Sequence, residues 1–467
     1  MVKLDWEIES DRVTEREHQE DEKQRKGHSR KPLRLLLAVL IFLGLVAASI
    51  FLIEKRMQQV TEMEESLLSQ TTEAEVAALR IGDRQAYMAL QRSASEEWLA
   101  SQSAVFDAYQ SRKINSDIQL TGRVVDVQID GSRGRVQVEE IENDTPYVNT
   151  WFYWYYAEEL DEQGRQIAPA GWFHVPADYT FWGAPTTIER GPFVVRYQAL
   201  DAPFAQSLAD KLSQWADFAC GVLPCGDLPL ITVDVTPNQL PSMRWTSGSA
   251  WQLVVPSPYI DRARYDQPFE LELQIEAATL LAERLVEHVR PQAPEYPHDA
   301  YYMHSGVVSW LVGQFVEVNT ESQLVQSIAE NYGTEYVGRL LTELPPTANM
   351  DALAGILGVS DLSTANLDWR DLLSWRLVTE DELISRGEEA AWTALYDFTN
   401  PDVMAQAYER YNANQAPQNY KVTDLQPQAT ESGVPEVMAI VYVGENNVFQ
   451  EQRILFRMVN NVWLRAS

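Results

Sequence analysis

The sequence has few of the residues on which disulfide scaffolds and nucleic-acid-binding proteins depend. Its 467 residues include two cysteines, so neither a thiolate zinc cluster nor a disulfide-dense scaffold can form. Lysine and arginine together number 37 against 68 acidic residues, which gives a formal charge of −31. Such a chain is repelled at long range by a polyanion, and we therefore expect no nucleic-acid partner.

Several catalytic signatures are also missing. The chain contains no GxSxG, P-loop, GxGxxG or CxxC sequence, which excludes the commonest nucleophile, phosphate-loop, dinucleotide and redox motifs. His174, followed by Asp178 in GWFHVPADY, suggests one acid–base pair. A histidine beside a proline at a strand end is more often a packing residue, and we expect no catalytic residue.

One long apolar run is present. Residues 35–53 read LLLAVLIFLGLVAASIFLI, without a charge. As a helix this run spans about 28 Å, close to the ~30 Å hydrocarbon core of a bilayer. The alternative is a buried helix of a soluble domain, but such helices rarely lack charge over five turns. The run therefore predicts a transmembrane helix, with the lipid bilayer as a partner.

The basic flank of this run predicts its orientation. Residues 1–34 hold nine basic and nine acidic residues, so the whole charge of −31 belongs to the rest of the chain. The positive-inside rule places this tail in the cytoplasm and the bulk of the chain outside the plasma membrane. A cleaved signal peptide normally has a shorter leader and a shorter apolar stretch, so we favour an uncleaved single-pass anchor. The basic residues nearest the run are Lys23, Arg25, Lys26, Arg30, Lys31 and Arg34.

The two cysteines lie in FACGVLPCG, beyond the predicted span. In an oxidising compartment, the Gly- and Pro-containing turn between Cys220 and Cys225 favours a disulfide that closes a small loop. Two free, buried thiols are the alternative.

Residues 54–71 have a helical pattern typical of a stalk or a partner helix. Its apolar positions lie three and four residues apart. They are Met57, Val60, Met63 and Leu67.

Residues 72–188 change from helical to strand-like patterning. Alternating runs at 123–130 and 135–142 are separated by GSRG, which is a hairpin signal. An aromatic strand, WFYWYY, follows at 151–156. Alternate residues of a strand face opposite sides, so this strand predicts a sheet covered by helices on one face and by a neighbouring domain on the other. The segment order is typical of an α+β domain.

Two further regions follow. Residues 189–385 contain strand-like FVVRYQAL, a helix at 202–219, the strands ITVDVTP and WQLVVPSPYI, and then mostly helical sequence. Residues 386–467 begin with helices and continue with the strands VPEVMAIVYVG, FQEQRILFRMV and NVWLRAS. We therefore expect an α+β multidomain chain, with a mainly helical middle domain that holds a small sheet.

The first and third regions resemble the nuclear transport factor-like (SnoaL-like) cone fold. The resemblance depends on ALRIGDRQAYMAL at 78–90, a gapped first helix, and on QEQRILFRMVNNVWLRA at 450–466, a terminal strand pair. It implies two cone-fold α+β domains, at 72–188 and 386–467. That fold is found in enzymes, in binding proteins and in inert spacers.

The middle region is similar to the peptidase MA-like family of gluzincin metalloproteases, particularly those fused to membrane anchors in bacteria. The matching stretches are LPLITVDVTP at 228–237, VVSWLVGQFVEV at 307–318 and LAGILGVSDLSTANLDWRDLLSWRL at 353–377. The resemblance implies a zinc site built from HExxH on one helix and a glutamate on the next helix.

The helix that should carry HExxH reads QIEAATLLAERLVEHVRP, which lacks the histidine pair. One register places Ala282, Glu283 and Val286 on the motif, and the next places Glu283, Arg284 and Glu287 there. Neither register supplies two imidazoles, so the resemblance implies a degenerate site.

The third ligand is missing as well, because Gly313 occupies the position expected for the zinc-binding glutamate. We expect no metal and no cofactor. The residues that could rebuild a metal site are Glu283, Glu287 and His288, with His298 and His304 elsewhere in the middle region.

These patterns predict a single-pass, extracytoplasmic membrane protein whose pseudo-peptidase domain serves binding or scaffolding. The expected partner is an unidentified protein or another component of the cell envelope. The alternative is a hydrolase that uses an altered site in the middle domain or a cone-fold pocket.

Overall fold

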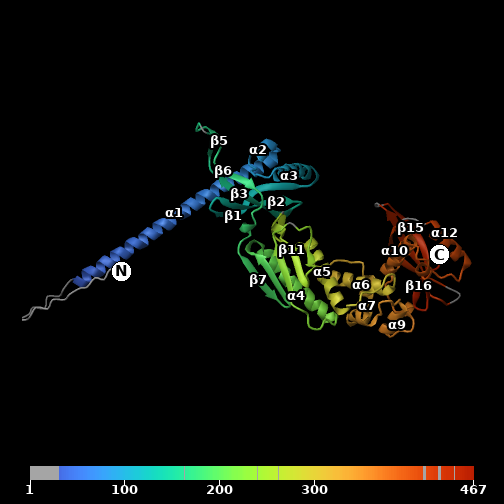
Figure 1. Ribbon diagram of the computed structural model, residues 1–467. Helices are drawn as coiled ribbons and strands as arrows, with labels where there is room; N and C mark the ends of the chain where they lie inside the picture. The colour runs from blue at the N-terminus through green and yellow to red at the C-terminus, as the bar shows by residue number, and fades with distance from the viewer. Residues whose placement is uncertain are drawn as a thin grey trace, which may run out of the picture. The chain divides into compact units, whose positions relative to one another are not determined.

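The computed structural model describes residues 31–161, 163–238, 240–260, 262–413, 417–429, 433–445 and 448–467. The chain divides into two units, Met1–Ser66 and Leu67–Ser467, and helix α1 (Lys31–Ile81) belongs to both (Figure 1). The second unit contains several sheets and many helices, so the predicted α+β multidomain class is confirmed.

Helix α1 contains the run expected to cross a membrane. No helix in the described part of the chain is long and apolar enough to cross a membrane. Most side chains of residues 31–47 lie outside the described residues, as do residues 1–30 of the predicted cytoplasmic tail. Beyond them the apolar side chains of α1 from Ile50 to Ile53 are exposed, as is the stripe of the predicted stalk.

The N-terminal sheet has the strand order β1-β2-β3-β12, with β6 also paired to β3, and its pairs are antiparallel. The predicted hairpin is confirmed, with Gly131 at φ +62° in its turn. The β1–β2 register shifts between Leu120 and Asp126, and such bulges bend a sheet. The strands are β1 (Ile118–Asp130), β2 (Arg133–Glu142), β3 (Thr145–Tyr156), β6 (Gly171–Val175) and β12 (Arg262–Arg264), and β4 (Glu159–Leu160) and β5 (Gln166–Ala168) form a separate hairpin.

Three helices cover this sheet: the end of α1, α2 (Arg84–Ala89) and α3 (Glu96–Asn115) (Figure 1). The expected interruption lies between α1 and α2, where the Asp83 carboxylate accepts a hydrogen bond from the Ala86 backbone N–H at 2.9 Å. Helix α3 begins in the same way, because the Ser95 hydroxyl accepts from the Trp98 backbone N–H at 3.2 Å.

The aromatic strand β3 contributes to two different cores. Tyr153 is fully buried in the core beneath α1. Phe152 points the other way, into the core of the middle region, and stacks on Trp182 with ring centroids 5.4 Å apart. Alternation along the strand therefore places residues of β3 in a core on each face of the sheet, as predicted, although Trp154 and Tyr155 near its end are exposed.

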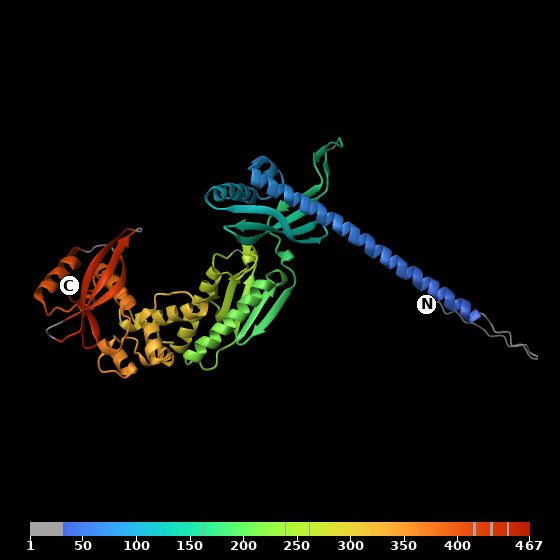
Figure 2. The same cartoon turned by 180° about the vertical axis from the view of Figure 1, so that it is seen from behind.

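The middle sheet has the order β10-β11-β9-β8-β7. Strands β8, β9 and β11 are parallel neighbours, and α4 (Ala202–Val222) connects β8 to β9 and packs on the sheet (Figure 2). Alternate residues of the sheet's strands β8 and β9 are buried on the side that the helices cover, which is the pattern of a sheet with one covered face. The strands are β7 (Pro185–Arg190), β8 (Phe193–Gln198), β9 (Ile231–Thr236), β10 (Arg244–Thr246) and β11 (Ser249–Pro256).

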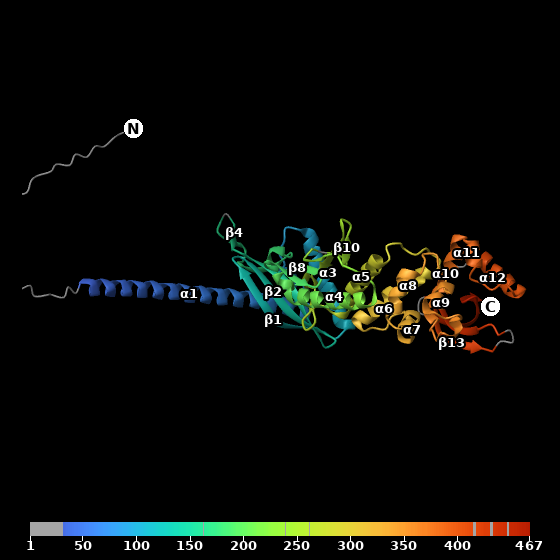
Figure 3. The same cartoon turned by 90° about the horizontal axis from the view of Figure 1, so that it is seen from below.

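The rest of the middle region is helical, as the sequence predicts. Figure 3 shows these helices gathered in one group, in which α5 and α6 pack side by side. They are α5 (Leu271–Val289), α6 (Asp299–Val316), α7 (Gln323–Tyr332), α8 (Glu335–Glu343), α9 (Asp351–Leu357) and α10 (Arg370–Arg386). The 3₁₀ turn η4 (Leu362–Thr364) lies between α9 and α10, and η1 (Tyr179–Trp182), η2 (Ala199–Asp201) and η3 (Pro258–Ile260) lie earlier in the chain.

The C-terminal region is an antiparallel meander, β13-β14-β15-β16, preceded by two short helices. Helix α10 packs against β13, where the Val422 backbone N–H donates to the Ser374 hydroxyl at 2.9 Å. Strand β13 was not predicted, because its exposed face is polar and its apolar alternation is short: Tyr420 and Val422 alternate, and the register against β14 then shifts between Val422 and Asp424. The elements are α11 (Glu389–Thr393), α12 (Pro401–Ala413), β13 (Asn419–Gln428), β14 (Glu436–Glu445), β15 (Val448–Val459) and β16 (Val462–Arg465).

Helix α8 approaches the end of α4 through a glycine, and this contact predicts a large effect of one methyl group. A Cβ atom at Gly338 would lie 2.6 Å from the Val222 carbonyl oxygen and 3.3 Å from Pro224 Cδ. We expect Gly338→Ala to lower the free energy of unfolding by about 1–3 kcal/mol, because backbone must move to admit the methyl. Urea denaturation measures the change. Gly355→Ala in α9 is the control, since no atom in the part of the chain that the structure describes lies within 4 Å of its Cβ position. A loss of stability there equal to that at Gly338 would contradict the steric explanation.

Candidate functional site

A cavity of about 480 Å³ lies where the end of α5 meets α6 and β11, and we call it the α5–α6 cavity. Helix α5 supplies residues from its last turns, α6 supplies one residue from its second turn, and the α5–α6 loop closes one side. The lining residues are Trp251, Arg284, Glu287, His288, Arg290, Pro291, Ala293 and His304. This helix pair is the one in which the peptidase resemblance expects its zinc ligands.

The two HExxH registers on α5 fall on different faces of the helix. Ala282 and Val286 are fully buried in the core. Glu283 and Glu287 are exposed, and partial burial together with the neighbouring Glu287 carboxylate raises the pKa of Glu283. Of the two acids, Glu287 lines the cavity, and its carboxylate is paired with Arg284 at 3.0 Å.

The space that a side chain at Gly313, the position expected for the third zinc ligand, would need is occupied by the loop that follows α6. A Cβ atom at Gly313 would lie 2.8 Å from the Thr320 hydroxyl and 3.2 Å from the Val318 carbonyl oxygen. Gly313 faces the loop after α6 and does not line the α5–α6 cavity. A glutamate cannot be placed at this position without moving that loop.

The candidate histidines have separate surroundings. The His288 Nε2 atom lies 3.0 Å from the Cys225 carbonyl oxygen, so this nitrogen carries the proton and donates it. His304 lies across the cavity on α6, and burial, together with the Arg290 charge, lowers its pKa. His298 precedes α6 and is not among the lining residues. Within the described ranges, no group of three or more His, Cys, Asp or Glu side chains is arranged to hold a metal ion.

The two cysteines lie beside this cavity and are bonded to each other. Cys220 and Cys225 form a disulfide with a Cα–Cα distance of 5.3 Å. The bond closes the turn after α4, and the carbonyl of Cys225 accepts the hydrogen bond from His288 described above. The disulfide loop thereby orients one imidazole of the cavity wall.

A second polar cluster is buried in the N-terminal domain, around Glu75 of α1. The Glu75 carboxylate is fully buried and accepts hydrogen bonds from Gln91 at 2.8 Å and from the Tyr153 hydroxyl at 2.8 Å. His174 Nδ1 lies 2.7 Å from the same carboxylate, with the rings of Trp98 and Trp151 packed around the imidazole.

His174 and Asp178 do not form the pair that the sequence suggested. Asp178 instead accepts a hydrogen bond from the Thr180 backbone N–H at 3.0 Å and forms an ion pair with Arg133 at 3.2 Å. The four-residue spacing places the two side chains apart, because His174 lies in β6 and Asp178 begins the turn η1. The partner of His174 is Glu75, which is 99 residues away in the chain.

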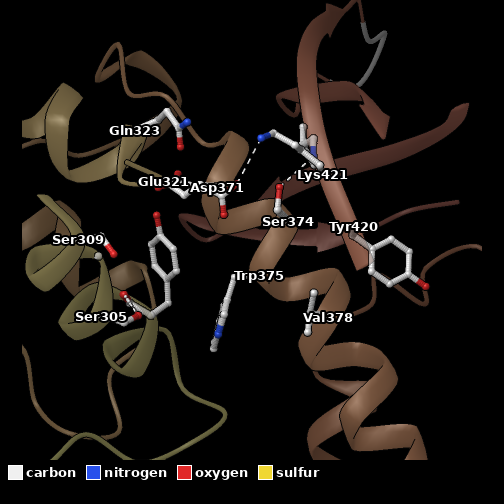
Figure 4. Close-up of a pocket in the computed structure, with 13 residues that line it drawn as sticks. Ser305, Ser309, Glu321, Gln323, Asp371, Ser374, Trp375, Val378, Tyr420 and Lys421 are labelled. Carbon is white, nitrogen blue, oxygen red and sulfur yellow. Dashed lines mark hydrogen bonds and ion pairs between the residues drawn. The ribbon is translucent and has the colours of Figure 1, made fainter. Parts of the chain in front are cut away.

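A third site is a cavity of about 300 Å³ between α6, α10 and β13 (Figure 4). At its edge Lys421 is paired with Glu321 at 3.3 Å. Asp371 accepts hydrogen bonds from the Leu324 and Leu372 backbone N–H groups at 3.2 and 3.0 Å, and burial raises its pKa. The charged groups of this cavity therefore already have partners. Lys421 and Glu321 pair with each other, and Asp371 accepts from a backbone N–H in the first turn of α7.

Comparison with known proteins adds no assignment. No protein-family model, curated protein or solved structure matches this chain. The interpretation of the three sites therefore depends on their geometry.

The residues that the sequence analysis missed are Arg290 and Glu75. Arg290 follows the last residue of α5 and gives no sequence signal, because a basic residue at a helix end is ordinary. Glu75 does give one. It lies seven residues after Leu68, three before Ala78 and four before Leu79, and this helical spacing places a carboxylate on the apolar face of α1.

Asp201, at the start of α4, carries a buried carboxyl group, and it predicts a pH-dependent stability. It accepts a hydrogen bond from Ser257, its other oxygen has no partner among the described residues, and burial raises its pKa to about 6. Because the folded state binds this proton more tightly than the unfolded state, stability falls as the pH rises from about 4 to 6. At neutral pH the cost is about 3 kcal/mol.

We expect Asp201→Asn to be more stable than the natural protein at pH 7.5, with the difference shrinking toward pH 4. Urea denaturation of both proteins at the two pH values measures it. A stability difference that does not change with pH would show that the carboxyl does not titrate in this range.

Proposed function

We propose that this chain is a membrane-anchored, extracytoplasmic binding protein. In this proposal residues 189–385 form a peptidase-like module that binds a ligand without cleaving it, between cone-fold domains at 72–188 and 386–467. A cytoplasmic tail at 1–34, a span at 35–53 and a stalk at 54–71 hold these domains at the plasma membrane. The partner is a component of the cell envelope.

The observation that carries this proposal is the chemistry of the α5–α6 cavity. Two arginines, Arg284 and Arg290, line this cavity, which lies between the two helices that would carry the zinc ligands of a metalloprotease. Their positive charges oppose the binding of a divalent cation. The packing around Gly313 supports the same conclusion, because it leaves no room for the third ligand.

The apolar surface of α1 supports the anchor. The side chains from Ile50 to Ile53, which are the last four residues of the uncharged run at 35–53, are more than half exposed. Exposed aliphatic surface of this extent needs a covering, and lipid supplies one. The ectodomain's acidic excess keeps it away from an anionic lipid surface.

Hydrolysis assays separate binding from catalysis. We expect the full-length protein, purified in detergent, to show no casein or peptide hydrolysis that a chelator abolishes, and no stoichiometric zinc. Chelator-sensitive hydrolysis that persists through purification and is lost in Glu283→Ala would overturn the proposal in favour of a hydrolase.

Protease accessibility tests the topology independently. Protease added to spheroplasts should digest the chain beyond Arg56 and spare a tag at Met1. A digested N-terminal tag together with a protected C-terminus would reverse the orientation.

A further inference from the structure

Arg290 is a buried cation whose hydrogen bonds are incomplete. Its residue is only 6 % exposed, and its Nη2 donates to the Leu344 carbonyl oxygen at 2.9 Å. Its Nη1 is buried and has no partner among the described residues, and burial lowers the pKa of the guanidinium. A buried charge without an opposite charge or a full set of hydrogen bonds is costly to the folded state. Such a group is retained more readily where a ligand completes its bonding.

Two other side chains on the same cavity each have a buried nitrogen without a partner among the described residues. Arg284 pairs with Glu287 through Nη1 and lies over the ring of Trp245 at 4.9 Å, but its Nε is buried without a partner among the described residues. The Nδ1 atom of His304 is likewise buried without one. The Arg290 charge contributes to the lowered pKa of His304, so the two side chains are electrostatically coupled.

The cavity is a positive region in an acidic protein. Two arginines face one carboxylate, Glu287, which is exposed and already paired, whereas the chain as a whole carries −31. The indole of Trp251 packs edge-on against His288, with ring centroids 5.3 Å apart, and forms an aromatic wall. A volume of about 480 Å³ is within the range of small-molecule sites.

We propose that the α5–α6 cavity binds a small ligand through an oxyanion group, a carboxylate or a phosphate. Arg290 receives the oxyanion at the buried end, Arg284 pairs with it from α5, and Trp251 packs against the uncharged part. Guanidinium groups suit this ligand, because their planar N–H donors match the oxygen pairs of carboxylate and phosphate. This inference depends on the proposed binding function and names its ligand class.

Calorimetric titration of the full-length protein in detergent tests the inference with three probes. They are N-acetylalanine, its uncharged amide N-acetylalaninamide, and inorganic phosphate. We expect at least one anion to bind and the amide not to bind, because the two alanine derivatives differ in little beyond the charge. The stronger anion identifies the group that the cavity prefers. Failure of both anions to bind, or binding of the amide as tight as that of its acid, would overturn the proposal.

Variants then locate the binding. Arg290→Met should lower the affinity for the anion by about tenfold or more, since a charge-assisted hydrogen bond is lost. Arg284→Gln, at a partly exposed position, should weaken it several-fold and keeps the test valid if Arg290→Met does not fold. Arg339→Gln is the control, because Arg339 lies on α8 and pairs with Glu343 outside the cavity. Unchanged affinity in both cavity variants would place the anion elsewhere.

The outcome is separable from that of the proposed function. Topology and the absence of hydrolysis are measured without the anion, so a chain that passes those assays but binds no anion refutes the ligand class alone. A chain that binds the anion and also hydrolyses peptides in a chelator-sensitive way refutes the non-catalytic function alone.

Discussion

Arg376→Met is expected to lower the free energy of unfolding by about 3–5 kcal/mol, the usual cost of removing one partner of a buried ion pair. Arg376 of α10 donates to the Asp299 carboxylate of α6 from Nε at 3.2 Å and from Nη2 at 2.6 Å. Its Nη1 donates to the Trp463 carbonyl oxygen of β16. Both charged side chains are 5 % exposed. The substitution leaves Asp299 charged and buried, and it disconnects three elements at once.

Urea denaturation of the full-length protein in detergent, followed by tryptophan fluorescence, measures this loss. Arg339→Met is the matched control, because its ion pair with Glu343 is solvent-exposed and worth less than about 1 kcal/mol. The double variant Asp299→Leu with Arg376→Met should lose less than the sum of the two single variants, since neither leaves a lone charge. Equal losses of stability for Arg376→Met and Arg339→Met would show that the buried ion pair stabilises the fold no more than an exposed one.

Glu75→Ala should destabilise the N-terminal domain by about 3 kcal/mol or more. Three buried donors, from Gln91, Tyr153 and His174, lose their common acceptor, and each unsatisfied group costs about 1–3 kcal/mol. Glu75→Gln should cost less, because the amide oxygen still accepts although the amide nitrogen adds a donor. The measurement is the urea midpoint, together with near-UV circular dichroism, to which the Trp98 and Trp151 rings beside His174 contribute.

Glu73→Ala is the control for this cluster, since Glu73 lies two residues away on the same helix and is exposed. It should change stability by no more than about 0.5 kcal/mol. Equal losses of stability for Glu75→Ala and Glu73→Ala would show that the buried cluster does not stabilise the fold.

Much of the secondary structure could be predicted from residue patterning. The hairpin of β1 and β2 follows from strict alternation around a glycine-containing turn, and α4 follows from apolar spacing of three and four residues. The failures have a common cause. Strands β12 and β13 are short or polar, and they form because a partner strand or helix supplies their hydrogen bonds and one covered face.

The candidate sites were less accessible to sequence reasoning. The HExxH comparison identified α5 and α6 as the helices to inspect, and Glu287, His288 and His304 all line the cavity that they form. It did not identify Arg290, whose importance comes from burial that no local pattern reveals. It also paired His174 with a neighbour in sequence, whereas the actual partner lies on a different element.

The sequence by itself determined the order of the segments, the alternation of faces within each strand and helix, the acidic balance of the chain and the departures from the metalloprotease pattern. These depend on local periodicity and on residue identity, which are present in any single stretch of chain. Only the tertiary structure decided which polar side chains are buried and what they meet. Asp299 and Arg376 are 77 residues apart, and Glu75 and His174 are 99 residues apart. Such pairs are selected by which surfaces pack together, because a polar group in a core is stable only when the fold brings it a partner.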